Sequence, residues 1–326
     1  MAQAKYYVVL LMVTMIWGAT PASGKLLVDA MSPLLITGLR FICIAALLFG
    51  WLFITGNKKA FHPEKRLLLI MIAMGFMGVL VHNGLLFTGL HYTTATNTAL
   101  IESIGPTATT VLAFLFIGER LNKSGWLGIF ISCAGAVCIV TRGSLNVLLS
   151  LSFNIGDLII IACEVAWSAY VIIGWFTHGK VPTVELTAWM GLAGAIMCFA
   201  VGGVTGTLEV GDIDAKAMGG FAYLTLASGV FAFVGWNWAA NAVGASKAGS
   251  FVYIVPLMGA IIGTTVLGEP LAIGQAVGAL LIIGGVIITV RAKVRIKSED
   301  KQSSPENPLD RYPELKEHYV RESNQK

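Results

Sequence analysis

Glu102 is the first residue of this sequence whose type and setting point to chemistry. It is the only Asp, Glu, Lys or Arg in the apolar stretch 67–117. A carboxylate in hydrocarbon costs on the order of 3 kcal/mol even on lenient scales, and such residues usually face a polar interior. We therefore expect Glu102 to line a cavity and to take part in proton coupling. The alternative is a structural acid that pairs with His82, Arg40 or a backbone group.

Glu164 is a second acid within an apolar run, and Trp167 and Val171 follow it three and seven residues later. This spacing places the three side chains on one face of a helix. A substrate amine or another cation could bind between the carboxylate and the aromatic ring, partly by cation–π attraction. Pairing of Glu164 with another helix is the alternative.

Three more polar residues lie within apolar runs: Arg40, His82 and Asn83. The Asn83 amide offers donors and an acceptor, and a histidine titrates near neutral pH. His82 and Asn83 could contact a substrate, or they could form hydrogen bonds between helices. Arg40 could neutralise an anionic substrate, but we favour a side chain that extends to the outer membrane surface.

Aromatic side chains recur in the same runs. Trp and Tyr commonly form a belt at the membrane interface, so a belt or packing role is the default expectation for each. Together they also predict an aromatic lining for a cavity, with an amide beside one tryptophan. The residues concerned are Trp17, Trp167, Tyr170, Trp236, Asn237 and Tyr253.

The composition predicts that helices in a bilayer position these residues. The chain is 56% hydrophobic and 12% charged, whereas about a quarter of the residues of a soluble domain are charged. Apolar stretches of about 18 or more residues, long enough to span a bilayer as a helix, recur along the chain. We predict an all-α membrane protein with ten transmembrane helices, at 6–24, 33–55, 67–89, 95–117, 125–141, 155–177, 184–206, 218–241, 247–267 and 271–290.

The lysines and arginines between these helices predict the orientation. With the N-terminus in the cytoplasm, nine basic residues lie in cytoplasmic loops and nine more in the tail after Val290, whereas only Lys25, Arg142 and Lys216 lie outside. Such a bias is typical of inner-membrane proteins, here with both termini cytoplasmic. The formal net charge of +4 therefore reflects topology, and no affinity for nucleic acid is expected.

A shift of 150 residues superposes the two halves of the sequence. Trp17 then falls on Trp167, and an ungapped run of matches begins at Pro106 on Pro256 and continues through the fifth span. Each half holds five spans, an odd number, so the second copy crosses the membrane upside down. Such inverted repeats are common in secondary transporters, where they support alternating access. We divide the chain into a first repeat at 1–142, a second repeat at 143–290 and a polar tail at 291–326.

The repeated prolines fall within predicted spans four and nine. A proline inside a helix leaves the carbonyl four residues earlier without its helical donor, and these carbonyls belong to Glu102 and Val252. In a membrane a freed carbonyl must find another partner or face a wet cavity. We interpret Pro106 and Pro256 either as cavity-facing hinges or as static kinks.

Other repeated residues have structural interpretations. Glu119 and its counterpart Glu269 each follow a glycine at a helix end, where an acid favours the positive end of the following helix. The glycines at 128, 135, 274 and 278 offer small faces for helix packing, within the chain or in a homodimer. The five cysteines lie in apolar spans without metal-ligand spacing, so we predict no metal site and no cofactor.

These motifs resemble a known family. Trp17–Gly18, Gly118–Glu119 and the stretch 268–285 are similar to those of the drug/metabolite transporter superfamily, in its EamA-type ten-helix branch. The resemblance covers residues 6–290, with one departure, Ser168, where the first half has a glycine. It implies a carrier of small metabolites, often an amino-acid exporter. Its cavity would lie between two four-helix groups, with the fifth and tenth helices outside.

The sequence therefore predicts a secondary transporter, an exporter or exchanger, for amino acids or related amphiphilic or cationic metabolites. It has no phosphate-binding loop for a primary pump, and no HExxH or GxSxG motif for a membrane enzyme. An organophosphate or nucleotide-sugar carrier is the alternative, but its cavity would need several basic residues, and only Arg40 qualifies. The expected partners are a small-molecule substrate, the lipid bilayer and protons as the coupling ion.

Overall fold

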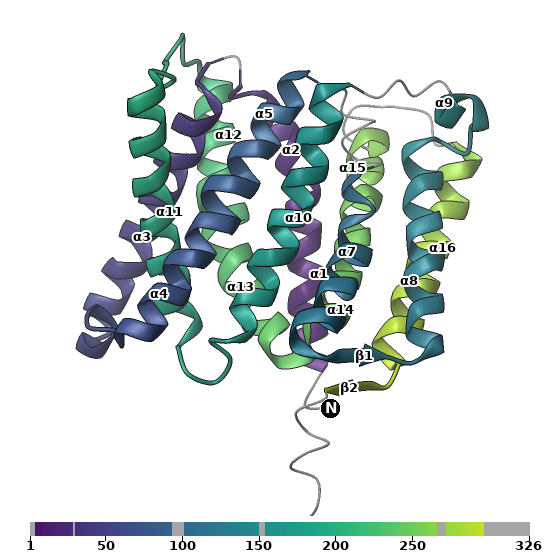
Figure 1. Cartoon of the computed structure of the whole chain (residues 1–326). Coiled ribbons are helices and arrows are strands. Elements are labelled where there is room, and N and C mark those ends of the chain that lie inside the picture. Colours follow the sequence, from purple (N-terminus) through teal and green to yellow (C-terminus); the bar gives the residue numbers. More distant parts are fainter. Residues whose placement is uncertain (1–3, 29, 93–100, 150–153, 266–271, 297–326) are drawn as a thin grey trace, which may run out of the picture.

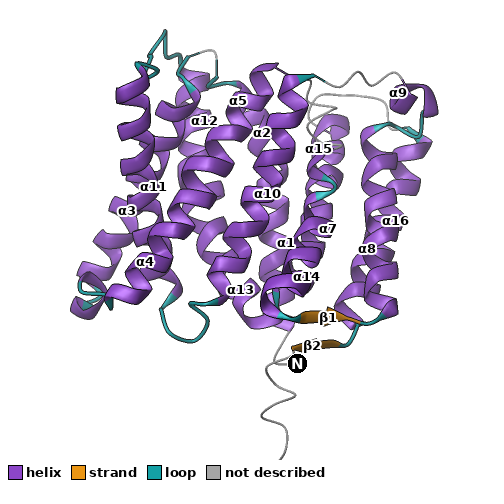
Figure 2. Ribbon diagram, viewed as in Figure 1, coloured by secondary structure: helices purple, strands orange, loops and turns teal. Residues whose placement is uncertain are grey.

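The structure is a computed structural model that describes residues 4–28, 30–92, 101–149, 154–265 and 272–296. Within these residues the chain is almost wholly helical (Figure 2). The first half holds α1 (Ala4–Gly18), α2 (Thr20–Lys25), α3 (Pro33–Ile54), α4 (Lys65–Met74), α5 (Gly84–Tyr92), α7 (Gly105–Leu112) and α8 (Lys123–Val140). The second half holds α9 (Leu145–Leu149), α10 (Ile155–Trp175), α11 (Thr183–Thr205), α12 (Ala215–Thr225), α13 (Ala232–Val243), α14 (Ala245–Ser250), α15 (Ile254–Thr265) and α16 (Ile273–Arg291).

Apolar helices account for every predicted span. In the described part of the chain, 8 helices are long and apolar enough to cross a membrane, and two shorter apolar helices are Ala4–Gly18 and Gly105–Ile117. The predicted all-α membrane fold is therefore confirmed. The number of ten crossings stays a prediction, because these two helices are shorter than the ~20 residues that a crossing ordinarily takes.

The two halves run through the molecule in opposite directions (Figure 1). α1 starts at the end where the strands β1 (Glu119–Leu121) and β2 (Val294–Ile296) lie, whereas its counterpart α10 starts at the opposite end. The helix contacts come in matching pairs, because α1 packs on α13 and α15 while α10 packs on α5 and α7. α3 packs on its own counterpart α11, and α8 on α16. Two inverted copies produce this pairing, and the predicted inverted repeat is confirmed.

Glycines allow α8 and α16 to pack closely. A Cβ on Gly128 would lie 2.6 Å from the carbonyl oxygen of Gly285, and one on Gly135 would lie 2.7 Å from that of Gly278. The 150-residue shift relates Gly128 to Gly278 and Gly135 to Gly285, so the contact is symmetric. These glycines face a helix of the same chain, so the alternative of packing within the chain holds for them, and a homodimer stays a prediction.

Several membrane helices widen into π-helical segments. The segment η2 (Gly75–Asn83) joins α4 to α5, and η4 (Leu226–Phe231) joins α12 to α13 at the equivalent place of the second half. A third, η3 (Ala113–Ile117), follows α7. Such segments are rare and often occur at functional sites.

The repeated prolines lie near helix starts. Ser103 and Ile104 form a turn, and α7 begins at Gly105 with Pro106 in its first turn. Pro256 lies in the first turn of α15, after the 3₁₀ segment η5 (Phe251–Tyr253). A proline suits a first turn, because the N–H groups there have no intrahelical acceptor in any case. The picture of a proline kink within one continuous helix is therefore wrong for Pro106.

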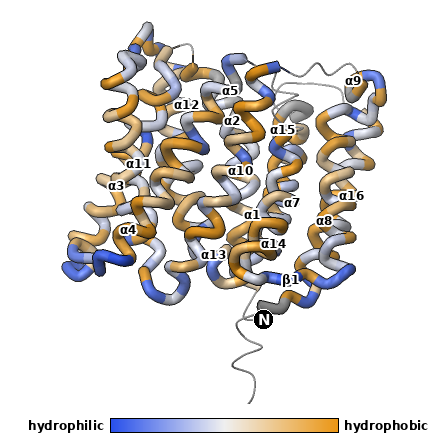
Figure 3. The backbone as a smooth tube through the Cα atoms, in the orientation of Figure 1, coloured by the Kyte–Doolittle hydropathy of each residue, from blue (hydrophilic) through white to orange (hydrophobic). Residues whose placement is uncertain are grey.

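Polar residues gather at the two ends of the bundle, with an apolar band between them (Figure 3). β1 and β2 pair antiparallel at one end, with Glu119 opposite Ile296 and Leu121 opposite Val294. The N-terminus lies at the same end (Figure 1). The first residues of the predicted polar tail therefore include a short strand, at 294–296. Residues 297–326 lie outside the described part of the chain.

Candidate functional site

A cavity of about 110 Å³ lies between the two halves. A space of this size can hold several water molecules or part of a small solute. None of its lining residues belongs to α8 or α16, so the fifth and tenth helices stay outside it. The lining residues are Trp17, Thr20, Arg40, His82, Asn83, Leu86, Glu102, Ser103, Glu164, Trp167, Ser228, Phe233, Val252, Val255 and Pro256. The cavity thus brings together the predicted residues Trp17, Arg40, His82, Asn83, Glu102, Glu164, Trp167 and Pro256.

Arg40 points inward from α3 and is only 1% exposed. Its Nε donates to the carbonyl oxygen of Leu224 at 2.8 Å, and its Nη1 donates to Asn83 Oδ1 at 3.2 Å. A third donor, Nη2, lies 3.5 Å from the Ser228 hydroxyl. The predicted extension of Arg40 to the membrane surface is therefore wrong, because these neutral oxygens inside the bundle satisfy the guanidinium.

Side-chain donors also reach backbone carbonyls of the π-helical segments. Asn83 Nδ2 donates to the Gly78 oxygen at 2.7 Å, and Trp17 Nε1 donates to the Ser228 oxygen at 3.2 Å. The hydroxyls of Ser228 and Thr20 lie 2.9 Å apart. In a membrane each backbone polar group needs such a partner. These bonds join α1, α3, η2 and η4 into one polar wall of the cavity.

Glu102 and Glu164 line the same cavity as Arg40, but their carboxyl groups differ from its guanidinium in their partners. Neither carboxyl has a hydrogen-bond or ion-pair partner among the described residues. The two groups are near enough to act on each other electrostatically. A Cβ at Gly105 would overlap the Glu164 carboxylate, so this glycine makes room for it. The predicted alternative of a pairing of Glu102 with His82 or Arg40 is not found among these residues.

Aromatic rings also line the cavity and pack behind its lining. The repeat-related rings of Trp17 and Trp167 meet edge to face at 5.3 Å, and each lies against Trp236, at 5.3 and 5.4 Å. Phe233 closes this cluster 5.7 Å from Trp17. Equivalent residues meet in this way where the two halves face each other. The tryptophans that the sequence singled out thus form one cluster.

Pro106 and four of the predicted substrate-binding residues do not line the cavity in this conformation. The Tyr170 hydroxyl donates to Asn237 Oδ1 at 2.6 Å, and Asn237 Nδ2 donates to Thr187 at 3.2 Å. Tyr253 lies 2.9 Å from the Thr107 hydroxyl. Together with Trp236 these side chains are almost fully buried.

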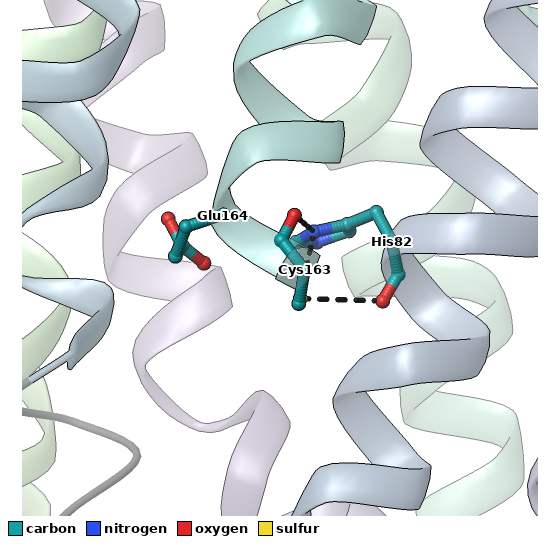
Figure 4. A group of neighbouring side chains, drawn as sticks. All are labelled: His82, Cys163 and Glu164. Carbon is teal, nitrogen blue, oxygen red and sulfur yellow. Dashed lines mark hydrogen bonds between the residues drawn. The ribbon is translucent and has the colours of Figure 1, made fainter. Parts of the chain in front are cut away.

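His82 forms a contact between η2 and α10 (Figure 4). Its Nδ1 lies 3.2 Å from the Cys163 carbonyl oxygen and 3.1 Å from Cys163 Sγ, and the Cys163 thiol donates to the His82 carbonyl at 3.3 Å. The ring also lies 5.0 Å from Trp167. The alternative of a hydrogen bond between helices therefore holds for His82, although its side chain also lines the cavity.

Sequence reasoning missed Thr20, Ser103, Ser228 and Cys163. Small hydroxyl residues are common in membrane helices and carry no charge that would single them out. Cys163 looked like a small apolar residue. The 150-residue shift was the one available signal for Ser228, because it places this serine on Gly78, another residue of the polar wall.

Glu119 belongs to a separate site at the end of the bundle. Its carboxylate accepts hydrogen bonds from the N–H groups of Ala245 at 3.1 Å and Ser246 at 3.0 Å, at the start of α14. Burial raises the pKa of Glu119, although these bonds and the charge of Lys247 act against the rise. The predicted contact with the following helix is wrong, because Asn122 caps that helix. Glu269 lies outside the described residues.

A sequence model of the EamA-like transporter family matches the chain twice, over residues 4–141 and 154–291. The chain belongs to the EamA-like transporter family. The second match begins and ends 150 residues after the first, at 154 against 4 and at 291 against 141. The predicted family and its internal repeat are therefore confirmed, and the protein is a multi-pass membrane transporter.

The relatives of the transporter carry names of the same kind. It is 31% identical over 308 residues to "Uncharacterized transporter YyaM" of Bacillus subtilis (strain 168), across 93% of this chain and 99% of that protein. It is 25% identical over 287 residues to "Uncharacterized inner membrane transporter YedA" of Escherichia coli (strain K12), across 85% and 88%. A solved crystal structure has a TM-score of 0.73 over 87% of the transporter and 96% of its own chain. With 19% identity, that likeness concerns the fold alone.

Proposed function

We propose that the transporter moves small zwitterionic or cationic metabolites, such as amino acids or related amphiphiles, by alternating access. One observation carries the proposal: Glu102 and Glu164 line the same cavity as Trp17, Trp167 and Phe233, and neither carboxyl has a partner among the described residues. A substrate ammonium would neutralise them and could also lie against Trp167, since cations are attracted to aromatic faces. The apolar part of such a substrate would contact the tryptophans.

The same lining argues against the anionic alternative. An organophosphate or nucleotide-sugar carrier would need several cationic donors for its substrate. Arg40 is the one Lys or Arg among the lining residues, and neutral acceptors already hold its guanidinium. A single carboxylate of a zwitterion is the largest anionic group that this setting favours.

Repeat-related residues support alternating access. Thr20 lines the cavity, whereas its counterpart Tyr170 is buried, and the same holds for Leu86 and Trp236. Ser103 likewise lines the cavity, whereas its counterpart Tyr253 does not. In transporters with inverted repeats, the second conformation arises when the halves exchange their arrangements. Tyr170, Trp236 and Tyr253 would then line the cavity that opens at the other end. The prolines show the opposite pattern, because Pro256 of the second half lines the cavity and Pro106 of the first half does not.

The basic loops support one orientation of the transporter in the membrane. The connections from α3 to α4 and from α10 to α11 lie on the side where β1 and β2 lie, and they hold Lys58, Lys59 and Lys180. Basic loops favour the cytoplasm. We therefore place that end, and both termini, inside the cell. The lining residues Trp17 and Thr20 follow α1 toward the other end, so the present cavity would lie in the outer half, and export would load the substrate in the other conformation.

Flux in liposomes tests the coupling role of Glu102. A thermal-shift screen over amino acids, polyamines and cationic dyes first identifies a substrate. A proton gradient should drive its flux through the wild type, and Glu102→Gln should abolish this response because it removes the exchangeable proton. The matched control is Glu185→Gln, which changes a buried acid of α11 outside the cavity lining. Undiminished gradient-driven flux in Glu102→Gln would refute the coupling role.

A further inference from the structure

We infer that the transporter binds a thiophilic divalent cation, with Zn²⁺ as the test ion, between η2 and α10. The ligands are His82, Cys163 and Glu164, whose nitrogen, sulfur and carboxylate oxygen atoms all lie within 4.8 Å of one another (Figure 4). His82 is 81 residues from Cys163 along the chain. No spacing rule applied to the sequence brings them together.

The separations suit a tetrahedral ion. With metal–sulfur and metal–nitrogen bonds of about 2.3 and 2.0–2.1 Å, neighbouring ligand atoms of a zinc site lie roughly 3.4–3.6 Å apart. Cys163 Sγ and His82 Nδ1 are 3.1 Å apart, and one ligand atom from each of the three residues lies within 4.8 Å of the other two. Rotations of these side chains can therefore complete the geometry.

The donor set determines the class of ion. A thiolate, an imidazole and a carboxylate suit Zn²⁺ and similar transition ions, whereas Mg²⁺ and Ca²⁺ prefer oxygen ligands alone. His82 and Glu164 also line the cavity, so the fourth position can be filled by water or by a group of a solute. The site thus has three protein ligands and one open position.

The surrounding charges favour a cation. The Glu102 carboxyl acts electrostatically on both Cys163 and Glu164. Arg40 acts on His82 and opposes a cation, but its donors point to Leu224, Asn83 and Ser228. Two carboxylates and a thiolate outweigh one guanidinium.

Binding is a ligand exchange without a redox change. As the metal–sulfur bond forms, the Cys163 thiol gives up its hydrogen bond to the His82 carbonyl and releases its proton to water in the cavity. His82 binds as a neutral imidazole with its proton on Nε2, and Nδ1 gives up its contact with the Cys163 carbonyl. Glu164 binds as a carboxylate. The ion then links η2 of the first half to α10 of the second, so it should hold the present conformation and slow transport.

Cobalt spectroscopy tests the site without any substrate, so its outcome is independent of the proposed transport function. Co²⁺ added to the purified full-length protein should give a thiolate-to-cobalt charge-transfer band, and Zn²⁺ should remove that band by competition. Cys163→Ser should abolish the band. His82→Gln should weaken Co²⁺ binding by at least about tenfold, since even indirect partners of metal ligands contribute 10- to 100-fold.

The matched control is Cys198→Ser, because Cys198 is also fully buried but lies on α11. This variant should keep the band. Absence of a thiolate band in the wild type would overturn the site, as would its persistence in Cys163→Ser. If Cys163→Ser does not fold, His82→Gln decides the question, and an unchanged affinity in that variant would overturn the site.

Discussion

Arg40 differs from Glu102 and Glu164 in its hydrogen-bond partners. The guanidinium donates to the Leu224 carbonyl of α12 and to the Asn83 amide oxygen of η2, so it connects α3 to both of these elements. Glu102 and Glu164 have no such partners among the described residues. We therefore assign Arg40 mainly to holding the polar wall, and the carboxyls to the ligand.

Replacing Arg40 tests this assignment. Arg40→Lys keeps a charge but loses the planar set of donors that reaches separate acceptors. An unpaired buried polar group costs about 1–3 kcal/mol, so we expect the free energy of unfolding in detergent to fall by about that amount. Arg120→Lys, at an exposed position of β1, should change it by less than about 0.5 kcal/mol. Equal stability of the two variants would contradict a structural role for Arg40.

Sequence analysis could identify candidate site residues only where their residue type is rare in apolar spans. Glu102 and Glu164 were found because acids are rare in apolar spans, and the cavity does contain them. The direction of Arg40 could not be predicted, since its acceptors lie 43 and 184 residues away. The role of Cys163 could not be predicted either, because a thiol has no distinctive signal in an apolar run.

At the scale of elements, the Gly118–Glu119 motif joins two helices that are distant in sequence. Gly118 ends η3 in the left-handed region at φ +67°, and Gly244 precedes α14 at φ +94°; both conformations favour glycine. These turns bring the Glu119 carboxylate to the first N–H groups of α14. An acid at this position stabilises the start of a helix.

Substitutions at Glu119 should therefore affect stability. Glu119→Ala leaves two helix N–H groups without an acceptor and should lower the free energy of unfolding by about 1–3 kcal/mol. Glu119→Gln retains one acceptor and should cost less. Glu209→Gln, at an exposed loop position, should have little effect. A loss in Glu119→Ala no larger than in Glu209→Gln would rule out the cap.

The pH dependence has a definite sign. Burial raises the pKa of Glu119 in the folded state, so the folded protein binds this proton more tightly than the unfolded chain. Relative to Glu119→Gln, the wild type should gain stability as the pH falls through the folded-state pKa and lose it as the pH rises. Unfolding curves of both proteins across this range provide the measurement.

At the scale of the whole molecule, the inverted repeat allows the second conformation of the transport cycle to be predicted from the present one. Leu86 and Trp236 are equivalent by the 150-residue shift, yet only Leu86 lines the cavity. If the halves exchange arrangements, access to the two positions must change in opposite directions. Opposite changes in access at the two positions would distinguish an exchange of the halves from a general loosening of the bundle.

Cysteine labelling can measure the change in access at positions 86 and 236. In a background in which the five native cysteines are replaced, Leu86→Cys should react with a thiol reagent before a proton gradient is imposed, and Trp236→Cys should not. When the gradient drives turnover, labelling of Leu86→Cys should fall and that of Trp236→Cys should rise. Ala195→Cys, at a fully buried position outside the cavity lining, serves as the control and should stay unreactive. Parallel changes at 86 and 236 would contradict the exchange.

The sequence by itself determined the membrane class, the helix positions, the internal repeat and the family. These properties depend on local hydropathy and on similarity at a constant offset, both of which are visible along one chain. The tertiary structure decided which polar groups meet. It directed Arg40 to neutral oxygens, Glu119 to a helix 126 residues away, and His82 to Cys163 and Glu164. Which polar groups come into contact depends on how the helices pack, and helix packing involves residues that are distant in sequence.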